Sequence, residues 1–200
     1  SNVTHIFTTN EVFDDLSTFV EIAKKGYKFK VIPAFRADKI MNIEAEKYND
    51  FVSMLGEVKT LSDLEAKIEE RLIAFKAVGT TAADIALQSV YPVADKKEAE
   101  RVFKKRRAGK MVSDSEMKIF KGYLTYFLFA LYAKHNIATE LHIGAMRNNN
   151  SAMLAKLGLE IDRKIIAVDA AKEIGSYTAT VRLHKEVSVK VPYTVVAEAE

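Results

Sequence analysis

The segment from Leu141 to Asn150 gathers side chains that could do chemistry. A strand-like apolar approach leads to His142, Gly144 follows, and Arg147 stands beside asparagines at 148–150. An imidazole can bind a metal ion or move a proton, and a guanidinium group can grip a carboxylate through two hydrogen bonds. A packed core does not favour such a density of hydrogen-bonding groups, so the segment indicates a polar ligand.

Other polar side chains stand at the ends of predicted strands. Arg36 and Lys39 follow the second strand, and Asp84 closes the third. In β/α barrels the active site lies at the carboxyl ends of the strands, so we expect these groups to lie in one common site with His142 and Arg147. The guanidinium groups would bind a carboxylate, and the carboxylate of Asp84 would act as a base or a metal ligand.

Each of these residues also has a purely structural interpretation. A single histidine at the end of an apolar strand is often a satisfied structural residue. Arg36 could form a surface ion pair with Asp38, Asp84 could cap the next helix, and residues 148–150 could form a loop tip. No single signal decides between the two interpretations, but the convergence of polar groups on strand ends favours a site.

The composition is that of a globular protein. The chain has 200 residues, of which 48% are hydrophobic, and its net charge of +3 gives no global attraction to nucleic acid or membrane. The longest apolar run, from Tyr123 to Ala133, is about half of what a bilayer span needs. The absence of cysteine excludes disulfides and thiolate chemistry and fits a reducing compartment. We therefore expect a cytoplasmic protein with no membrane partner.

Strand and helix patterns alternate along the first three quarters of the chain. We expect Pro33 to stop the second strand, and two capping boxes, Ser62 to Glu65 and Ser113 to Glu116, to start helices. The alternation predicts an α/β fold with about four parallel strands, resembling part of a TIM-type β/α barrel. The predicted strands are 4–8, 28–32, 80–85 and 137–142, and the first predicted helix is 14–25.

The pattern changes after about residue 156. From Gly175 onward apolar and polar residues alternate, and after a turn at 185–186 the alternation resumes at Val187. This pattern predicts an antiparallel β-hairpin with one solvated face. We therefore predict two domains, a β/α segment at 1–156 and a small α+β unit at 157–200.

A basic run at 104–107 resembles a nucleic-acid patch. It lacks interleaved aromatic residues, and Glu98 and Glu100 lie nearby in the sequence. Both features favour a solvated helical face over a binding site.

Several segments resemble the central part of uronate isomerases, sugar-acid enzymes on a metal-dependent, hydrolase-like β/α barrel. The family normally has proline where Ala37 stands, and Ser-Asp-His-Gly where this chain has residues 83–86, so Asp84 is kept while its histidine and glycine are absent. The resemblance covers about residues 4–155, in the family's order and spacing. The matching segments are 7–10, 14–16, 31–39, 107–110 and 141–150.

The resemblance implies an aldose–ketose isomerisation of hexuronates such as glucuronate and fructuronate, with a divalent metal, commonly zinc. It assigns catalytic roles to Asp84 and His142, the second facing the metal, and substrate binding to Arg36, Arg147 and Asn148. The family's His-x-His pair and its late metal-binding aspartate have no counterpart here. A lone His142 falls short of the three protein ligands of catalytic zinc. The resemblance thus implies that the activity is incomplete in this chain alone, and that this chain could also lack the metal. A homo-oligomer could complete the sheet.

The tail, about 157–198, resembles the C-terminal domain of the ninth large-subunit ribosomal protein of bacteria. This second resemblance offers an alternative, a non-catalytic chimeric or structural protein with a tail that binds ribosomal RNA. Residues 156–200 hold equal numbers of basic and acidic side chains, which argues against autonomous RNA binding. The phosphate-facing candidates would be Arg163, Lys164, Arg182, His184 and Lys185.

Overall fold

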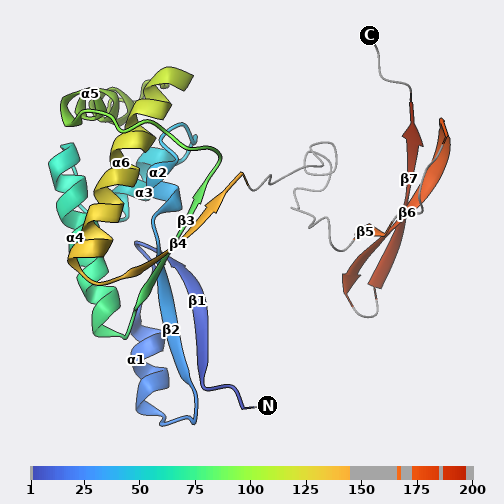
Figure 1. The fold of residues 1–200 in the computed structure, drawn as a ribbon, viewed down its shortest axis with the longest axis horizontal. Helices are drawn as coiled ribbons and strands as arrows, with labels where there is room; N and C mark the ends of the chain where they lie inside the picture. The colour runs from blue at the N-terminus through green and yellow to red at the C-terminus, as the bar shows by residue number, and fades with distance from the viewer. Residues whose placement is uncertain (1, 145–165, 168–172, 185–186, 197–200) are drawn as a thin grey trace. The chain divides into compact units, whose positions relative to one another are not determined.

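The computed structural model describes residues 2–144, 166–167, 173–184 and 187–196 (Figure 1). The chain consists of two compact units, Ser1–Ala145 and Met146–Glu200. The predicted domain boundary near residue 157 lies outside the described residues and stays a prediction.

The first unit is built on a parallel sheet of four strands in the order β1-β2-β3-β4. This arrangement confirms the predicted α/β fold. The strands are β1 (His5–Glu11), β2 (Lys30–Arg36), β3 (Ala82–Leu87) and β4 (Ala138–Ile143). The helices are α1 (Ser17–Lys24), α2 (Asp38–Met41), α3 (Tyr48–Ser53), α4 (Leu61–Ala77), α5 (Lys96–Arg107) and α6 (Asp114–Lys134).

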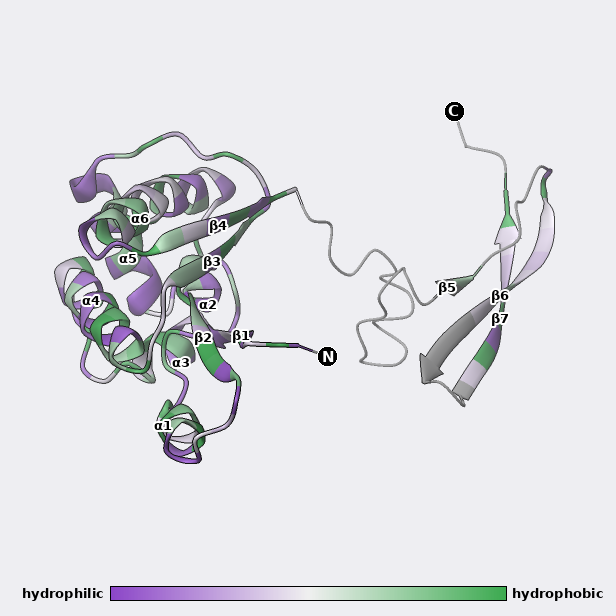
Figure 2. Cartoon of the chain, turned by 60° about the horizontal axis from the view of Figure 1, so that its bottom comes forward, coloured by the Kyte–Doolittle hydropathy of each residue, from purple (hydrophilic) through white to green (hydrophobic). Residues whose placement is uncertain are grey.

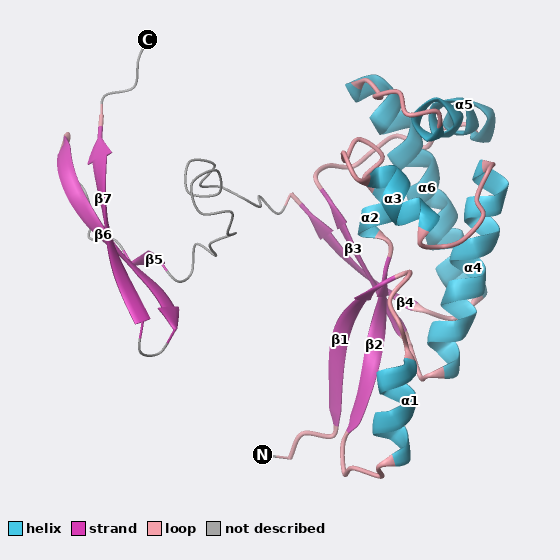
Figure 3. Cartoon of the chain, turned by 180° about the vertical axis from the view of Figure 1, so that it is seen from behind, coloured by secondary structure: helices cyan, strands magenta, loops and turns pink. Residues whose placement is uncertain are grey.

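The long helices α4, α5 and α6 gather on one face of this sheet (Figures 1 and 3). Phe35 of β2 is fully buried there and meets Phe75 of α4 and Tyr132 of α6 edge-on, with ring centroids 5.1 and 6.0 Å apart. Helix α4 carries hydrophobic residues on one side and hydrophilic residues on the other (Figure 2). Because side chains alternate along a strand, the residues next to these core positions point to the opposite face of the sheet.

Pro33 does not end the second strand, as the sequence had led us to expect. Strand β2 runs through it to Arg36. The carbonyl of Pro33 faces the start of β3, where it accepts a hydrogen bond from Thr80 Oγ1 (2.6 Å). Strand β3 pairs with β2 only at Phe35 and Arg36, so the missing N–H of Pro33 costs no hydrogen bond within the sheet.

The predicted capping box at Ser62 is also wrong, because α4 begins earlier. Thr60 is the N-cap, and it exchanges hydrogen bonds with Asp63. The side chain of Leu61 is fully buried, and its backbone N–H donates a hydrogen bond to a carboxylate oxygen of Glu100 at 2.7 Å. These two contacts hold the first turn of α4 in place. The second capping box is confirmed, with Ser113 and Glu116 bonded reciprocally at the start of α6.

The basic run at the end of α5 is not a fully solvated face. Arg106 is only 4% exposed. Its guanidinium donates hydrogen bonds to the carbonyls of Ile43, Ala45 and Glu46 at 2.8–3.0 Å. This residue therefore fixes the chain between α2 and α3.

The second unit contains an antiparallel sheet of β5 (Ile166–Ala167), β6 (Gly175–His184) and β7 (Val187–Val195). The pairing of β6 with β7 confirms the predicted hairpin, and Tyr177 stacks on Tyr193 across it at 5.6 Å. The predicted turn at 185–186 lies outside the described residues. Among the helices that the structure describes, none is long and apolar enough to cross a membrane.

Candidate functional site

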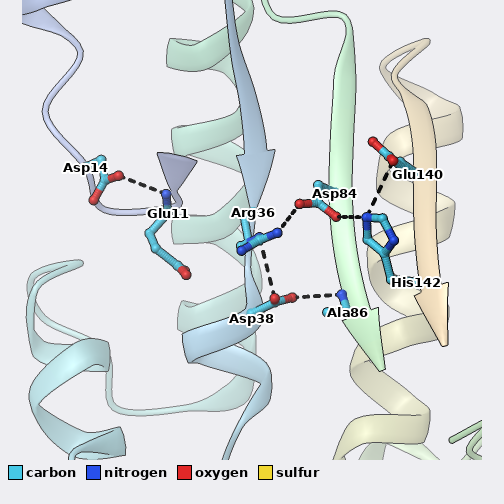
Figure 4. A network of polar contacts seen from close by, with 8 residues as sticks. All are labelled: Glu11, Asp14, Arg36, Asp38, Asp84, Ala86, Glu140 and His142. Atoms are coloured by element: carbon cyan, nitrogen blue, oxygen red, sulfur yellow. Dashed lines mark hydrogen bonds and ion pairs between the residues drawn. The ribbon is translucent and has the colours of Figure 1, made fainter. Parts of the chain in front are cut away.

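A row of charged side chains crosses the sheet on the face opposite the helices (Figure 4). The strand register aligns Glu11 with Arg36, Arg36 with Asp84, and Asp84 with Glu140. His142 lies two residues beyond Glu140 on β4 and therefore on the same face. All four strands thus contribute one charged residue to the same line.

Arg36 is held between two carboxylates. Its Nη2 donates a hydrogen bond to Asp84 Oδ2, and its Nε lies 3.5 Å from Asp38 Oδ2. The other oxygen of Asp38 accepts the backbone N–H of Ala86 at 3.1 Å. Asp84 is 5% exposed, so the guanidinium compensates a carboxylate that would otherwise be buried alone. These contacts fix the position of Arg36 at the end of β2.

His142 faces two carboxylates from the exposed edge of the sheet. Its Nε2 lies 3.1 Å from Asp84 Oδ1 and 3.4 Å from Glu140 Oε1. The contact with Asp84 lacks hydrogen-bond geometry, and among the described residues Oδ1 has no hydrogen-bond partner. The imidazole is about half exposed. A buried oxygen with a free lone pair therefore points toward a solvent-accessible histidine.

These three residues fit a divalent cation. One ligand atom each from Asp84, Glu140 and His142 lies within 4.8 Å of the others. Zinc ligands at about 2.0–2.1 Å from the metal in a tetrahedron are roughly 3.4 Å apart, close to the 3.1 and 3.4 Å found here. An imidazole nitrogen with two carboxylate oxygens is also a donor set that zinc accepts. His142, which stood alone as a metal-ligand candidate in the sequence, is therefore accompanied by two further candidate ligands in the structure.

Glu11 ends β1 beside Arg36 and is partly buried. Burial raises the pKa of the Glu11 carboxyl to about 7, although the charge of Lys39 opposes the shift. Among the described residues its Oε2 has no hydrogen-bond partner. Lys39 itself is exposed, and its ammonium lies over the rings of Phe13 and Phe51 at 5.4 and 5.3 Å.

The structure brings Arg36, Asp84 and His142 together, as the sequence predicted. Asp84 does not close its strand, because β3 continues to Leu87, and it caps no helix. The pairing of Arg36 with Asp38 exists and coexists with the Asp84 contact. Sequence reasoning missed Glu140, although its spacing of two from His142 already placed both on one face of a strand. Glu11 had no comparable signal.

Some predicted residues cannot be placed. Arg147 and Asn148 lie outside the described residues, and so do three of the RNA-binding candidates. The other two, Arg182 and His184, belong to β6, where their side chains are not described. The three candidates outside the described residues are Arg163, Lys164 and Lys185.

An apolar groove lies at the other end of the sheet. It encloses about 750 Å³ between α1 and the first residues of β1 and β2. Its lining is mainly aromatic and aliphatic, with His5, Tyr27 and Lys30 as charged or titratable groups and no carboxylate. It has neither the ion pairs nor the cation donors of the charged row, so we place the candidate site at the row.

Comparison with known proteins identifies the family. The sequence profile described as glucuronate isomerase matches residues 1–198. The chain belongs to the glucuronate isomerase family. That match includes the tail, so the resemblance of the tail to a ribosomal protein finds no support.

Two solved structures of the glucuronate isomerase type are similar to the chain. A uronate isomerase from Thermotoga maritima has a TM-score of 0.73 and 26% identity, with 78% of this chain and 36% of that chain covered. A glucuronate isomerase from Caulobacter crescentus has a TM-score of 0.71 and 20% identity, with 80% and 35% covered. The chain therefore spans about a third of the length of each protein.

Proposed function

We propose that the charged row is the sugar-acid site of a uronate isomerase, acting on a hexuronate such as glucuronate or fructuronate in the cytoplasm. The observation that carries this proposal is the contact of Arg36, Asp84 and His142 on the open face of a β/α sheet. Family membership supports it. Because the chain spans about a third of its relatives, further strands from a partner subunit or another segment would complete the sheet.

The reaction sets clear requirements for the site. An aldose becomes a ketose when the hydrogen on C2 moves to C1 and a hydroxyl proton moves from O2 to O1. Negative charge develops on these oxygens as the C2 proton leaves, so a site must hold them against positive groups. Arg36 meets this requirement, because its guanidinium retains N–H groups for a sugar oxygen or the substrate carboxylate beyond its contacts with Asp84 and Asp38.

The charge balance of the row favours a cation. Four carboxyl groups stand against two permanently charged cations, and the three other than Glu11, whose raised pKa keeps it partly protonated near pH 7, already outnumber them, so an anionic sugar would meet net repulsion on its own. We propose that Asp84, Glu140 and His142 hold a divalent metal, zinc by resemblance to the family. When bound, that ion would supply Lewis-acid stabilisation of the developing oxyanion. The four carboxylates are Glu11, Asp38, Asp84 and Glu140, and the cations are Arg36 and Lys39.

Each residue of the chain then has a separate task. Arg36 fixes Oδ2 of Asp84, which leaves Oδ1 to orient toward the cation, and this arrangement is how outer groups commonly fix metal ligands. His142 and Glu140 stand at the exposed edge, where substrate can approach. Arg147 and Asn148, proposed from the resemblance, would bind the substrate from the following segment.

The direct test is catalysis. The chain, in an assembly that completes the sheet, is incubated with zinc and glucuronate, and the ketose product is followed by NMR. We expect product with the wild type and a loss of at least 100-fold for His142→Ala, while His5→Ala, a histidine at the other end of the sheet, keeps the wild-type rate. Equal rates for the two variants, with folding intact, would reject His142 as part of the site.

A further inference from the structure

Unsatisfied polar atoms are concentrated on the charged row. Among the described residues, seven buried side-chain atoms have no hydrogen-bond partner, and three belong to Glu11, Arg36 and Asp84. These three residues are register partners on adjacent strands. A buried polar atom without a partner destabilises the fold, so a cluster of three indicates that a ligand or ordered water supplies the missing bonds.

The chemistry of the three atoms defines the ligand. Glu11 Oε2 and Asp84 Oδ1 are acceptors when ionised, whereas Arg36 Nε can only donate. A carboxylate ligand could satisfy the donor but would be repelled by both acceptors. A hydroxyl both donates and accepts, so a polyhydroxylated ligand can satisfy all three atoms.

Asp84 and Arg36 already have other tasks in the proposed site. Asp84 Oδ1 lies 3.1 Å from His142 Nε2 among the cation donors, and Arg36 pairs with Asp84 and Asp38. Glu11 lies on the far side of Arg36 from these donors, at the end of β1. Its Oε2 is therefore the acceptor that neither the cation nor Arg36 uses.

We propose that Glu11 is a substrate-binding residue that accepts a hydrogen bond from a sugar hydroxyl and extends the site onto β1. This inference rests on the proposed function and names a specificity residue within it. The charged groups around Glu11 are Arg36 on β2 and Asp38 and Lys39 on α2. With Glu11 ionised, these two cations and two carboxylates sum to zero, which suits recognition of a neutral hydroxyl better than recognition of an anion.

The test measures binding rather than turnover, by NMR titration of the zinc-loaded chain with glucuronate and with glucose, which shares the ring hydroxyls but lacks the carboxylate. We expect Glu11→Ala to weaken the binding of glucuronate and of glucose by a similar factor, about 10-fold for each. Glu11→Gln keeps an acceptor oxygen and should stay within about threefold of the wild type. Glu69→Gln on α4 is the control and should change neither affinity.

The outcomes separate this inference from the proposed function. Unchanged affinities in Glu11→Ala, or an equal loss in Glu11→Gln, would overturn the hydroxyl contact even if glucuronate binds better than glucose. A loss for both sugars in Glu11→Ala, without any preference for glucuronate, would keep the contact and reject a uronate site. A wild type that binds neither sugar would overturn both.

Discussion

Asp84 Oδ1 lies 3.1 Å from Nε2 of His142 and has no hydrogen bond of its own among the described residues, while Asp84 Oδ2 is held by Arg36. One oxygen of the carboxylate is thus fixed and the other is available. Because Asp84 is 5% exposed, an available oxygen there is costly unless it has a ligand. This relationship links the fold of the sheet to the proposed cation site.

Removal of a cation donor should abolish cation binding. We expect the wild-type chain to bind Co²⁺ with the visible absorption of a low-coordinate site, and Glu140→Gln or His142→Ala to weaken binding by at least 10-fold, because each variant leaves two ligands. A Co²⁺ titration followed by absorption measures this. His5→Ala should match the wild type, and an unchanged titration in His142→Ala would contradict a cation at this site.

Removal of Arg36 should destabilise the first unit. Arg36→Ala leaves the Asp84 carboxylate buried beside Asp38 without a counter-charge, which should cost about 2–4 kcal/mol in the free energy of unfolding. Urea denaturation measures the loss. The double variant Arg36→Ala with Asp84→Asn should recover much of it, since the stranded charge is gone. Strictly additive losses would mean that the two side chains do not act as a pair.

The raised pKa of Glu11 should make stability depend on pH. Burial raises it from 4.5 to about 7, so between these values the folded chain keeps a proton that the unfolded chain has lost. The free energy of unfolding therefore falls as pH rises through this window. Allowing for partial exposure, Glu11→Gln should be more stable than the wild type by about 1–2 kcal/mol at pH 8, and equal near pH 4.

Glu69 supplies a control of opposite sign for this pH dependence. Hydrogen bonds from Lys134 and His135 lower the pKa of Glu69, so its contribution is present above pH 4.5 and lost as pH falls. Glu69→Gln should therefore lose stability at neutral pH rather than gain it. A Glu11→Gln variant whose difference from the wild type does not vary with pH would contradict a raised pKa.

The start of α4 can be tested with two neighbouring hydroxyl residues. Thr60 bonds the N–H of Asp63, so Thr60→Ala should cost about 1 kcal/mol. Ser62 lies in the first turn of the helix and is exposed, so Ser62→Ala should stay within about 0.5 kcal/mol of the wild type. Thermal unfolding measures the loss of stability in each variant. A larger loss for Ser62→Ala than for Thr60→Ala would mean that Ser62 is the N-cap.

The sequence predicted the parallel sheet and the proximity of Arg36, Asp84 and His142, because polar residues at strand ends converge in such folds. It did not predict how far each strand extends. Pro33 continues β2 because the neighbouring strand starts later, and Asp84 lies inside β3. Such features depend on strand register, which pairs residues far apart in the chain. The position of Glu11 was missed for the same reason, since only the pairing of β1 with β2 places it beside Arg36.

Local patterns failed where tertiary contacts decided the outcome. Helix α4 begins before Ser62 because Leu61 is buried and its backbone N–H donates a hydrogen bond to Glu100 of α5. Arg106 does not lie on a solvated face as predicted, because it is buried and donates hydrogen bonds to three carbonyls between α2 and α3. In both cases a distant partner overrides the local pattern.

The most direct measurement of the central claim is where glucuronate binds. Glucuronate is titrated into the zinc-loaded chain while the side-chain NMR signals of Arg36, His142 and His5 are followed. We predict saturable shifts of Arg36 and His142, larger than those caused by glucose, with His5 unchanged. Shifts confined to His5 in the apolar groove, or none at Arg36 and His142, would contradict a sugar-acid site on the charged row.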